Sequence, residues 1–219
     1  LGSTTFQAQK WPAGGGFNND RDWKKIQKRA PVTVENANAI RDRAQHVDLV
    51  GAELWNFGFA ASYRGEKTNP NLTICGGTPE YSANNTHYVE QGRNISNADI
   101  KVGRKVVVIG PAIAEILFPF TDPLQKTIKL DGHKYTVIGV LEKKSSSMGG
   151  NYDNYNIIPI SVFQQVYGMR DNRGNLRSVN VTVRAKSPEL VPQAIDEVRA
   201  ILRVERGVKA SEEDDFEIF

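Results

Sequence analysis

Cysteine is almost absent from this chain of 219 residues, which contains Cys75 alone. A single cysteine excludes an internal disulfide, and with it the small secreted scaffolds that disulfides hold together. Cys75 ends the apolar run Leu72-Thr73-Ile74-Cys75, which favours a buried, inert thiol over a nucleophile. An extracytoplasmic domain without disulfides remains compatible with this composition.

Long apolar runs are also missing. No stretch reaches the roughly 18 to 20 uninterrupted apolar residues that a membrane-spanning helix needs. The longest candidate, residues 106–120, is interrupted by Gly110, Pro111, Glu115 and Pro119. The N-terminus has no charged segment followed by an apolar one, so the sequence shows no signal peptide. We therefore expect no membrane span within these residues.

Neither sign of charge predominates, because 28 basic residues stand against 25 acidic ones and leave a net charge of +3. The densest basic stretch, 21–43, is interleaved with Asp22, Glu35 and Asp42. A nucleic-acid surface needs basic residues gathered on one face, so we expect no nucleic-acid partner. Hydrophobic residues make up 39% of the chain, which is enough for an ordinary core.

Catalytic and cofactor-binding templates are missing too. The strand-glycine-helix pattern at 106–114 has only Gly110, whereas a dinucleotide site needs three glycines. His46, His87 and His133 lie far apart with no metal-ligand neighbours at suitable spacing. There is no Gly-x-Ser-x-Gly elbow and no phosphate-binding loop. We therefore predict no catalytic residue, no cofactor, no metal site and no enzyme activity.

The apolar spacing predicts an α+β fold in which one α/β part is interrupted by an inserted part. Thr33 is placed to cap a helix, and a second helix follows Pro188 with an apolar stripe. Asp131-Gly132 joins two strands in a tight hairpin. We predict a loose N-terminal arm at 1–29, one discontinuous subdomain at 30–75 and 177–219, and an inserted mixed α/β subdomain at 76–176. The acidic run 212–215 is predicted to be a solvated segment before a final strand.

Several short motifs occur in a fixed order along the middle of the chain. They are Gly77-Thr78-Pro79, Gly92-Arg93, Val106 to Gly110, Asp122-Pro123, Lys126-Thr127-Ile128, Tyr135 to Glu142 and Ile158-Pro159-Ile160. In order and spacing they resemble the periplasmic core domain of MacB-type ABC transporter permeases, in the MacB/FtsX-like permease superfamily. The resemblance covers roughly residues 30–219. Gln125 departs from it, because the family usually has glycine there.

The resemblance implies an arrangement that the residues alone do not show. Its discontinuous subdomain is porter-like, and the domain lies on the periplasmic side of the bacterial inner membrane, between the first and second membrane helices of a permease. The permease dimerises, and ATP is hydrolysed by a separate or fused cytoplasmic nucleotide-binding domain. The domain then acts on a periplasmic adaptor, or on a lipid-like or peptide cargo. Both ends of the chain must lie close together for this arrangement.

Two other functions remain open from the residues. A stand-alone periplasmic ligand-binding module is one, with Trp55, Phe57 and Phe59 lining a pocket. A hydrolase built on a polar cluster that the sequence does not reveal is the other. For partner contact the candidates are Met148 and Tyr152, which the loop 145–155 exposes, since loops often carry recognition.

Overall fold

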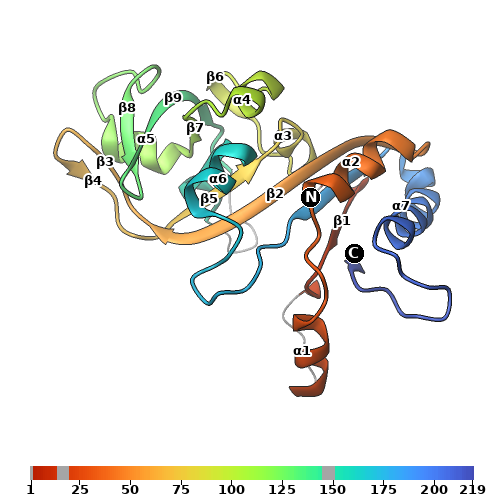
Figure 1. The fold of residues 1–219 in the computed structure, drawn as a ribbon. Helices are drawn as coiled ribbons and strands as arrows, with labels where there is room; N and C mark the ends of the chain where they lie inside the picture. Colours follow the sequence, from red (N-terminus) through yellow and green to blue (C-terminus); the bar gives the residue numbers. More distant parts are fainter. Residues whose placement is uncertain (1, 14–19, 145–150) are drawn as a thin grey trace. The chain divides into compact units, whose positions relative to one another are not determined.

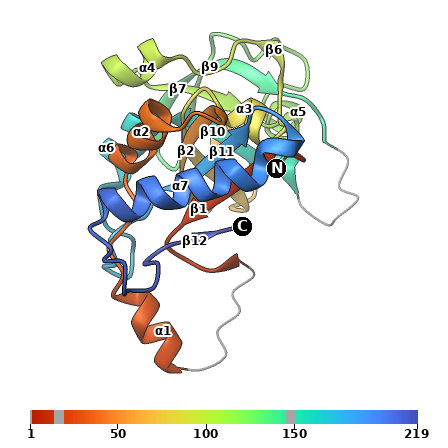
Figure 2. The same cartoon turned by 90° about the vertical axis from the view of Figure 1, so that its right-hand side faces the viewer.

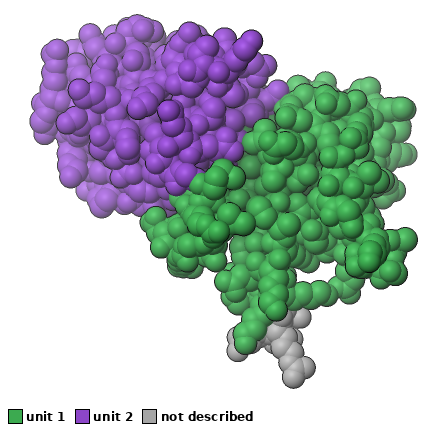
Figure 3. All heavy atoms as spheres, viewed as in Figure 1, with its two compact units in different colours: residues 1–53, 169–219 green, residues 54–168 purple. Residues whose placement is uncertain are grey.

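The computed structural model describes residues 2–13, 20–144 and 151–219, and it has the mixed α/β fold that the sequence predicts (Figure 1). It divides into two compact units, coloured separately in Figure 3. Unit 1 comprises Leu1–Glu53 and Met169–Phe219, and unit 2 comprises Leu54–Gly168. The insertion expected from the sequence runs from residue 76 to 176, whereas unit 2 also includes residues 54–75, and residues 169–176 belong to unit 1.

Unit 1 is built on an antiparallel sheet with the strand order β12-β1-β11-β2. The strands are β1 (Thr5–Gln9), β2 (Val47–Phe59), β11 (Asn180–Ala185) and β12 (Glu217–Ile218). In the register, Phe6 lies opposite Val183, and Val181 lies opposite Ala52. These four side chains are buried and form part of the core of unit 1.

The first strand corrects the prediction of a loose arm at residues 1–29. Thr5–Gln9 fill the position between β11 and β12, and the side chains of Phe6 and Ala8 are buried. Helix α1 follows at Asp20–Gln27. Five residues with two apolar side chains form too short a pattern to predict a strand from the sequence. The strands that pair with β1 come from the other end of the chain.

Two helices complete unit 1. Helix α2 (Val34–Arg43) begins with the predicted cap, because Thr33 and Asn36 exchange side-chain and backbone hydrogen bonds in a capping box. A 3-10 turn, η3 (Pro188–Leu190), leads into helix α7 (Val191–Glu205). Helix α7 buries Ala194, Val198 and Leu202, and it packs against α2. Figure 2 shows α7 running across the strands β1 and β11.

Unit 2 contains a mixed sheet with the order β5-β10-β7-β9-β8-β3-β4, in which β6 also pairs with β9. The β5–β10 and β7–β9 pairs are parallel, and the other pairs are antiparallel. The strands are β3 (Ala61–Tyr63), β4 (Glu66–Lys67), β5 (Leu72–Gly77), β6 (Val89–Gly92), β7 (Val106–Ile109), β8 (Thr127–Leu130), β9 (His133–Leu141) and β10 (Tyr155–Pro159). Because β5 pairs with β10 inside this sheet, residues 72–77 belong to unit 2.

The helices of unit 2 are short. They are α3 (Tyr81–Asn84), α4 (Asn97–Val102), α5 (Pro111–Leu117), η2 (Tyr152–Asn154) and α6 (Ile160–Tyr167). Pro111 opens α5 directly after Gly110, as predicted. Asp131 and Gly132 both have positive φ, 50° and 76°, which is the backbone of a tight two-residue hairpin. The predicted hairpin is therefore confirmed.

Candidate functional site

The first and last strands of unit 1 lie side by side. Ala8 is opposite Ile218 and Gln9 is opposite Glu217 in the β1–β12 register. The backbone N–H of Gln7 donates to the backbone carbonyl of Phe219 at 2.9 Å, and the backbone N–H of Phe219 donates to the backbone carbonyl of Gln7 at 3.1 Å. The permease arrangement expected from the sequence requires both ends of the chain to lie close together, and this pairing meets that requirement.

An ion-pair cluster fixes the segment that leads into β12. This segment carries the acidic run 212–215, and Asp214 pairs with both Arg199 and Arg203 of α7. Glu213 pairs with Lys25 of α1, and this contact holds the pKa of the Glu213 carboxyl below its ordinary value. The prediction of a merely solvated segment is therefore wrong for Asp214, whose side chain is only 17% exposed.

Arg206 is the most deeply buried cation of this cluster, with a side chain that is 4% exposed. Its guanidinium donates to the carboxylate of Asp215 at 2.7 and 2.8 Å. It also donates to the carbonyls of Pro31 and Ala30 and to Oδ1 of Asn36. One side chain thus joins the end of α7, the segment before α2 and the segment before β12.

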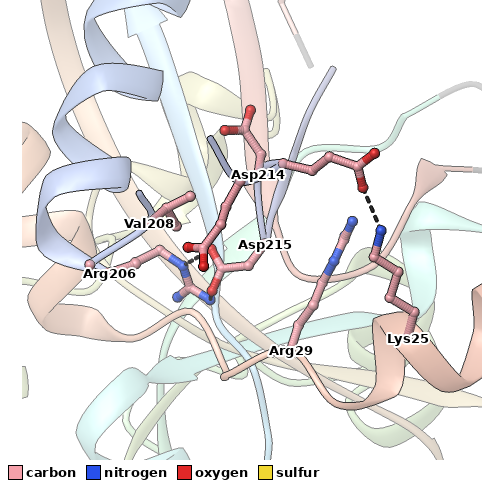
Figure 4. Close-up of a pocket in the computed structure, with 9 residues that line it drawn as sticks. Lys25, Arg29, Arg206, Val208, Asp214 and Asp215 are labelled. Carbon is pink, nitrogen blue, oxygen red and sulfur yellow. Dashed lines mark hydrogen bonds and ion pairs between the residues drawn. The ribbon is translucent and has the colours of Figure 1, made fainter. Parts of the chain in front are cut away.

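The cluster surrounds a cleft of about 470 Å³, shown in Figure 4. Its walls come from α1, the end of α7 and the segment before β12, and they include Lys25, Arg29, Arg206, Val208, Asp214 and Asp215. Arg29 pairs with Glu217 of β12 at 2.7 Å, so the terminal strand is held through its side chain as well. Charges of both signs line this cleft, and each of its three basic side chains, Lys25, Arg29 and Arg206, is paired with an acidic one.

Tyr152 lies in unit 2, on η2, within a group of aromatic side chains. Its ring centroid is 5.4 Å from that of Tyr155 and 6.2 Å from that of His87. The Nζ of Lys144 stands 4.9 Å from the centre of the Tyr152 ring, which is a cation–π contact. The other predicted contact residue, Met148, lies outside the described residues.

The aromatic stripe of β2 is divided between core and surface. Trp55 packs against the core cluster that contains Cys75 and Tyr81, and Cys75 is fully buried, as predicted. The Phe57 side chain is 66% exposed. Phe59 packs near Tyr167, with ring centroids 5.8 Å apart. The three residues therefore do not converge on one pocket.

His87, which the sequence shows only as a histidine without metal-ligand neighbours, is buried in the structure. Its side chain is 1% exposed, and its Nδ1 is 3.1 Å from the hydroxyl of Tyr81. Burial, assisted by the charge of Lys144, lowers the pKa of His87 to about 4. The imidazole is therefore neutral at neutral pH, and it acts as part of the aromatic packing.

Asp99 is the buried carboxylate of unit 2. Its side chain is fully buried and pairs with Arg93 and Arg104, each at 2.7 Å. It also accepts hydrogen bonds from the amide and the hydroxyl of Ser96. Burial by itself would raise its pKa, but these hydrogen bonds outweigh burial and lower the pKa far below the ordinary value. The group stabilises the start of α4.

Within the described ranges, no group of three or more His, Cys, Asp or Glu side chains is placed to hold a metal ion. His46 instead contacts Glu197 at 3.3 Å. Across the same part of the chain, none of the helices is long and apolar enough to cross a membrane.

The family model described as "MacB-like periplasmic core domain" matches residues 2–201. The chain belongs to this family. It is thus a periplasmic or extracellular domain of the kind found in MacB-type ABC transporter permeases, and the match places it among permease domains rather than catalytic ones.

Three curated relatives agree with this membership. The macrolide export ATP-binding/permease protein MacB of Bdellovibrio bacteriovorus is 26% identical over 87% of this chain. MacB of Chlorobaculum tepidum is 28% identical over 58% of the chain, and the permease YknZ of Bacillus subtilis is 24% identical over 69%. The aligned parts are 28%, 19% and 36% of those proteins, so the chain spans well under half of each relative.

Two crystal structures share the fold. The periplasmic region of MacB from Actinobacillus actinomycetemcomitans superposes with a TM-score of 0.74 at 17% identity, covering 100% of this chain and 89% of that one. The extracellular domain of the transporter YknZ from Gram-positive bacteria gives 0.72 at 22% identity, covering 98% and 99%.

Proposed function

We propose that this domain relays ATP-driven motion of an ABC transporter permease to a periplasmic adaptor or to cargo during export. In this proposal the permease is a dimer in the bacterial inner membrane, and a separate or fused cytoplasmic domain hydrolyses ATP. The membership of the MacB-like family supports the permease context. The pairing of β1 with β12 is the structural observation that carries the proposal.

The pairing supplies a mechanical path. When the polypeptide enters and leaves through β1 and β12, a displacement of either strand moves both, because Gln7 and Phe219 share two backbone hydrogen bonds. β1 also pairs with β11, and β11 pairs with β2. Strand β2 is continuous over 13 residues and passes from unit 1 into unit 2 after Glu53. A ladder of backbone hydrogen bonds stretches little, so it transmits displacement along this path.

The test uses the full transporter with the substitution Gln7→Pro. Proline has no amide hydrogen, so it removes the hydrogen bond from the backbone N–H of Gln7 to the Phe219 carbonyl. The opposite edge of β1, which pairs with β11, keeps its hydrogen bonds. We expect ATP hydrolysis to continue and export to fall at least fivefold. Gln7→Ala, which keeps the backbone donor, should export normally. Unimpaired export by the Gln7→Pro transporter would refute the relay.

We also propose that Met148 and Tyr152 contact the adaptor. Tyr152 supports this because its ring is held in place by Tyr155 and Lys144, and a preorganised aromatic side chain makes a strong interface contact. Capture of the adaptor by Met148→Glu and Tyr152→Ala variants tests the contact. Recovery equal to that of the unmodified transporter would remove both residues from the interface.

A further inference from the structure

A row of lysines crosses the exposed face of the sheet in unit 2. In the β8–β9 register Lys129 lies directly opposite Lys134. On the other side of β8, Lys129 lies opposite Ser62 of β3, and Ser62 lies opposite Lys67 of β4. Residues directly opposite one another share a face of the sheet, so Lys134, Lys129, Ser62 and Lys67 form one row across four strands.

This row costs stability, because like charges directly opposite one another on neighbouring strands repel. Lys67, Lys129 and Lys134 are exposed, and none of them forms an ion pair with any residue that the structure describes. Glu66 lies opposite Tyr63 and hence on the other face. Asp131, at the tip of the β8–β9 hairpin, accepts a hydrogen bond from the hydroxyl of Tyr167 and forms no ion pair with these lysines.

The same face is hollowed into a groove of about 590 Å³. Ten residues line it: Ser62, Tyr63, Arg64, Gly65, Gln125, Lys126, Thr127, Ile128, Lys129 and Lys134. Four of these are basic and none is acidic. Arg64, at the β3–β4 turn, has φ 44° and an exposed side chain, and Lys126 enters the groove just before β8. The groove therefore collects positive charge that the described part of the chain does not neutralise.

Three of the four carboxylates in the domain's own acidic run 212–215 are already paired, so the run is a poor counter-charge for a second copy. Glu213 pairs with Lys25, Asp214 with Arg199 and Arg203, and Asp215 with Arg206. Those carboxylates are already neutralised within unit 1.

A membrane surface is also a poor match for the groove. Surfaces that dock on anionic lipid usually add large apolar side chains that enter the bilayer. None of the exposed large hydrophobic residues of the described chain lies within 61–67 or 125–134. An extended acidic peptide fits better. Alternate side chains of an extended chain are about 6.7 Å apart, and neighbouring strands of a sheet are about 4.8 Å apart, so alternate carboxylates can reach lysines one and two strands apart.

We propose that the groove between the β3–β4 and β8–β9 hairpins binds an extended acidic segment of a partner protein. Lys129 and Lys134 hold its carboxylates at the centre, with Lys67, Arg64 and Lys126 around them. The proposal goes beyond the relay and rests on it only for the role of the partner, namely that the bound protein receives the motion.

The test measures binding of a fluorescently labelled ten-residue Glu-Ser repeat peptide to the 219-residue chain by anisotropy. We expect K129A/K134A to weaken binding at least tenfold. The control K101A/K186A removes the same charge from two exposed lysines without ion pairs among the described residues, and it should stay within twofold of the unmodified chain. Binding should weaken as salt rises, and a Gln-Ser repeat peptide should not bind.

Thermal denaturation separates loss of the site from loss of the fold. Removing like-charged neighbours leaves K129A/K134A at least as stable as the unmodified chain, so weak binding by a stable variant supports the site. Equal binding by both double variants would overturn it. So would vesicles of phosphatidylglycerol that bind through Lys129 and Lys134 when the peptide does not, since the partner would then be a membrane. None of these measurements involves transport, so a negative result would not contradict the proposed relay of motion. Likewise, unimpaired export by the Gln7→Pro transporter would not contradict the binding of an acidic segment in the groove.

Discussion

Arg206 and Asp215 form a two-point ion pair, with Nε to Oδ1 at 2.7 Å and Nη2 to Oδ2 at 2.8 Å. The same guanidinium donates to the carbonyls of Pro31 and Ala30. A planar guanidinium is the one side chain that reaches all these acceptors at once. The pair therefore ties three segments of unit 1 that lie far apart in sequence.

Arg206→Met should lower the free energy of unfolding by about 3–5 kcal/mol, because it leaves buried acceptors and a carboxylate without their donor. Chemical denaturation measures this. Arg199→Met is the control. The Arg199 side chain is 42% exposed, and Arg203 also pairs with Asp214, so its loss should cost less than about 1 kcal/mol. An equal loss in the free energy of unfolding for the two variants would show that the burial of Arg206 does not explain its contribution to stability.

Asp99→Asn should destabilise the chain by about 2–4 kcal/mol, since it leaves Arg93 and Arg104 without their anion and weakens the cap of α4. The control Asp42→Asn, at an exposed position of α2, should change stability by less than about 0.5 kcal/mol.

The pH dependence of the Asp99 effect has a definite sign. The pKa of Asp99 is depressed in the folded state, so its contribution is present above its unfolded pKa of about 3.9 and is lost as pH falls toward the folded value. The difference between Asp99→Asn and the unmodified chain should therefore shrink below about pH 4. A difference that stays constant down to pH 2 would contradict this account.

His87 should make the fold sensitive to mild acid. Its pKa falls from 6.5 to about 4 on folding, so the unfolded state binds a proton that the folded state does not. Stability is then complete above pH 6.5 and decreases as pH falls toward 4, by an amount on the order of 3 kcal/mol. Denaturation at pH 7, 6, 5 and 4 should show His87→Gln losing less over this interval. His133→Gln, at an exposed site, should follow the unmodified chain.

Gly110→Ala should cost more than about 2 kcal/mol. A Cβ at Gly110 would lie 2.1 Å from the carbonyl oxygen of Asp153, which is backbone and cannot move aside cheaply. Its φ of −69° is open to any residue, so the requirement is one of space. Gly77→Ala is the matched control, because its Cβ would have its nearest atoms at 3.6 Å. Thermal unfolding of the two variants compares them, and a tolerated Gly110→Ala would refute the steric account.

Local patterns in the sequence predicted the parts of the fold that depend on near neighbours. Thr33 and Asn36 are three residues apart and form the capping box of α2. Asp131-Gly132 forms the hairpin, and the stripe after Pro188 becomes the buried face of α7. The order of the motifs around Gly110 indicated the MacB-like family, which the family model matches over residues 2–201.

Only the tertiary structure decided which distant residues meet. β1 is a strand because β11 and β12 supply its hydrogen bonds from residues 180–185 and 217–218. The sequence predicts that the acidic run 212–215 is solvated, whereas in the structure it forms ion pairs with Lys25, Arg203 and Arg206. Lys129 and Lys67 lie in one row because each is opposite Ser62. Helix caps and turns are set by residues within about four positions, whereas strand neighbours and ion pairs depend on how remote segments pack, which a single sequence read by local pattern does not contain.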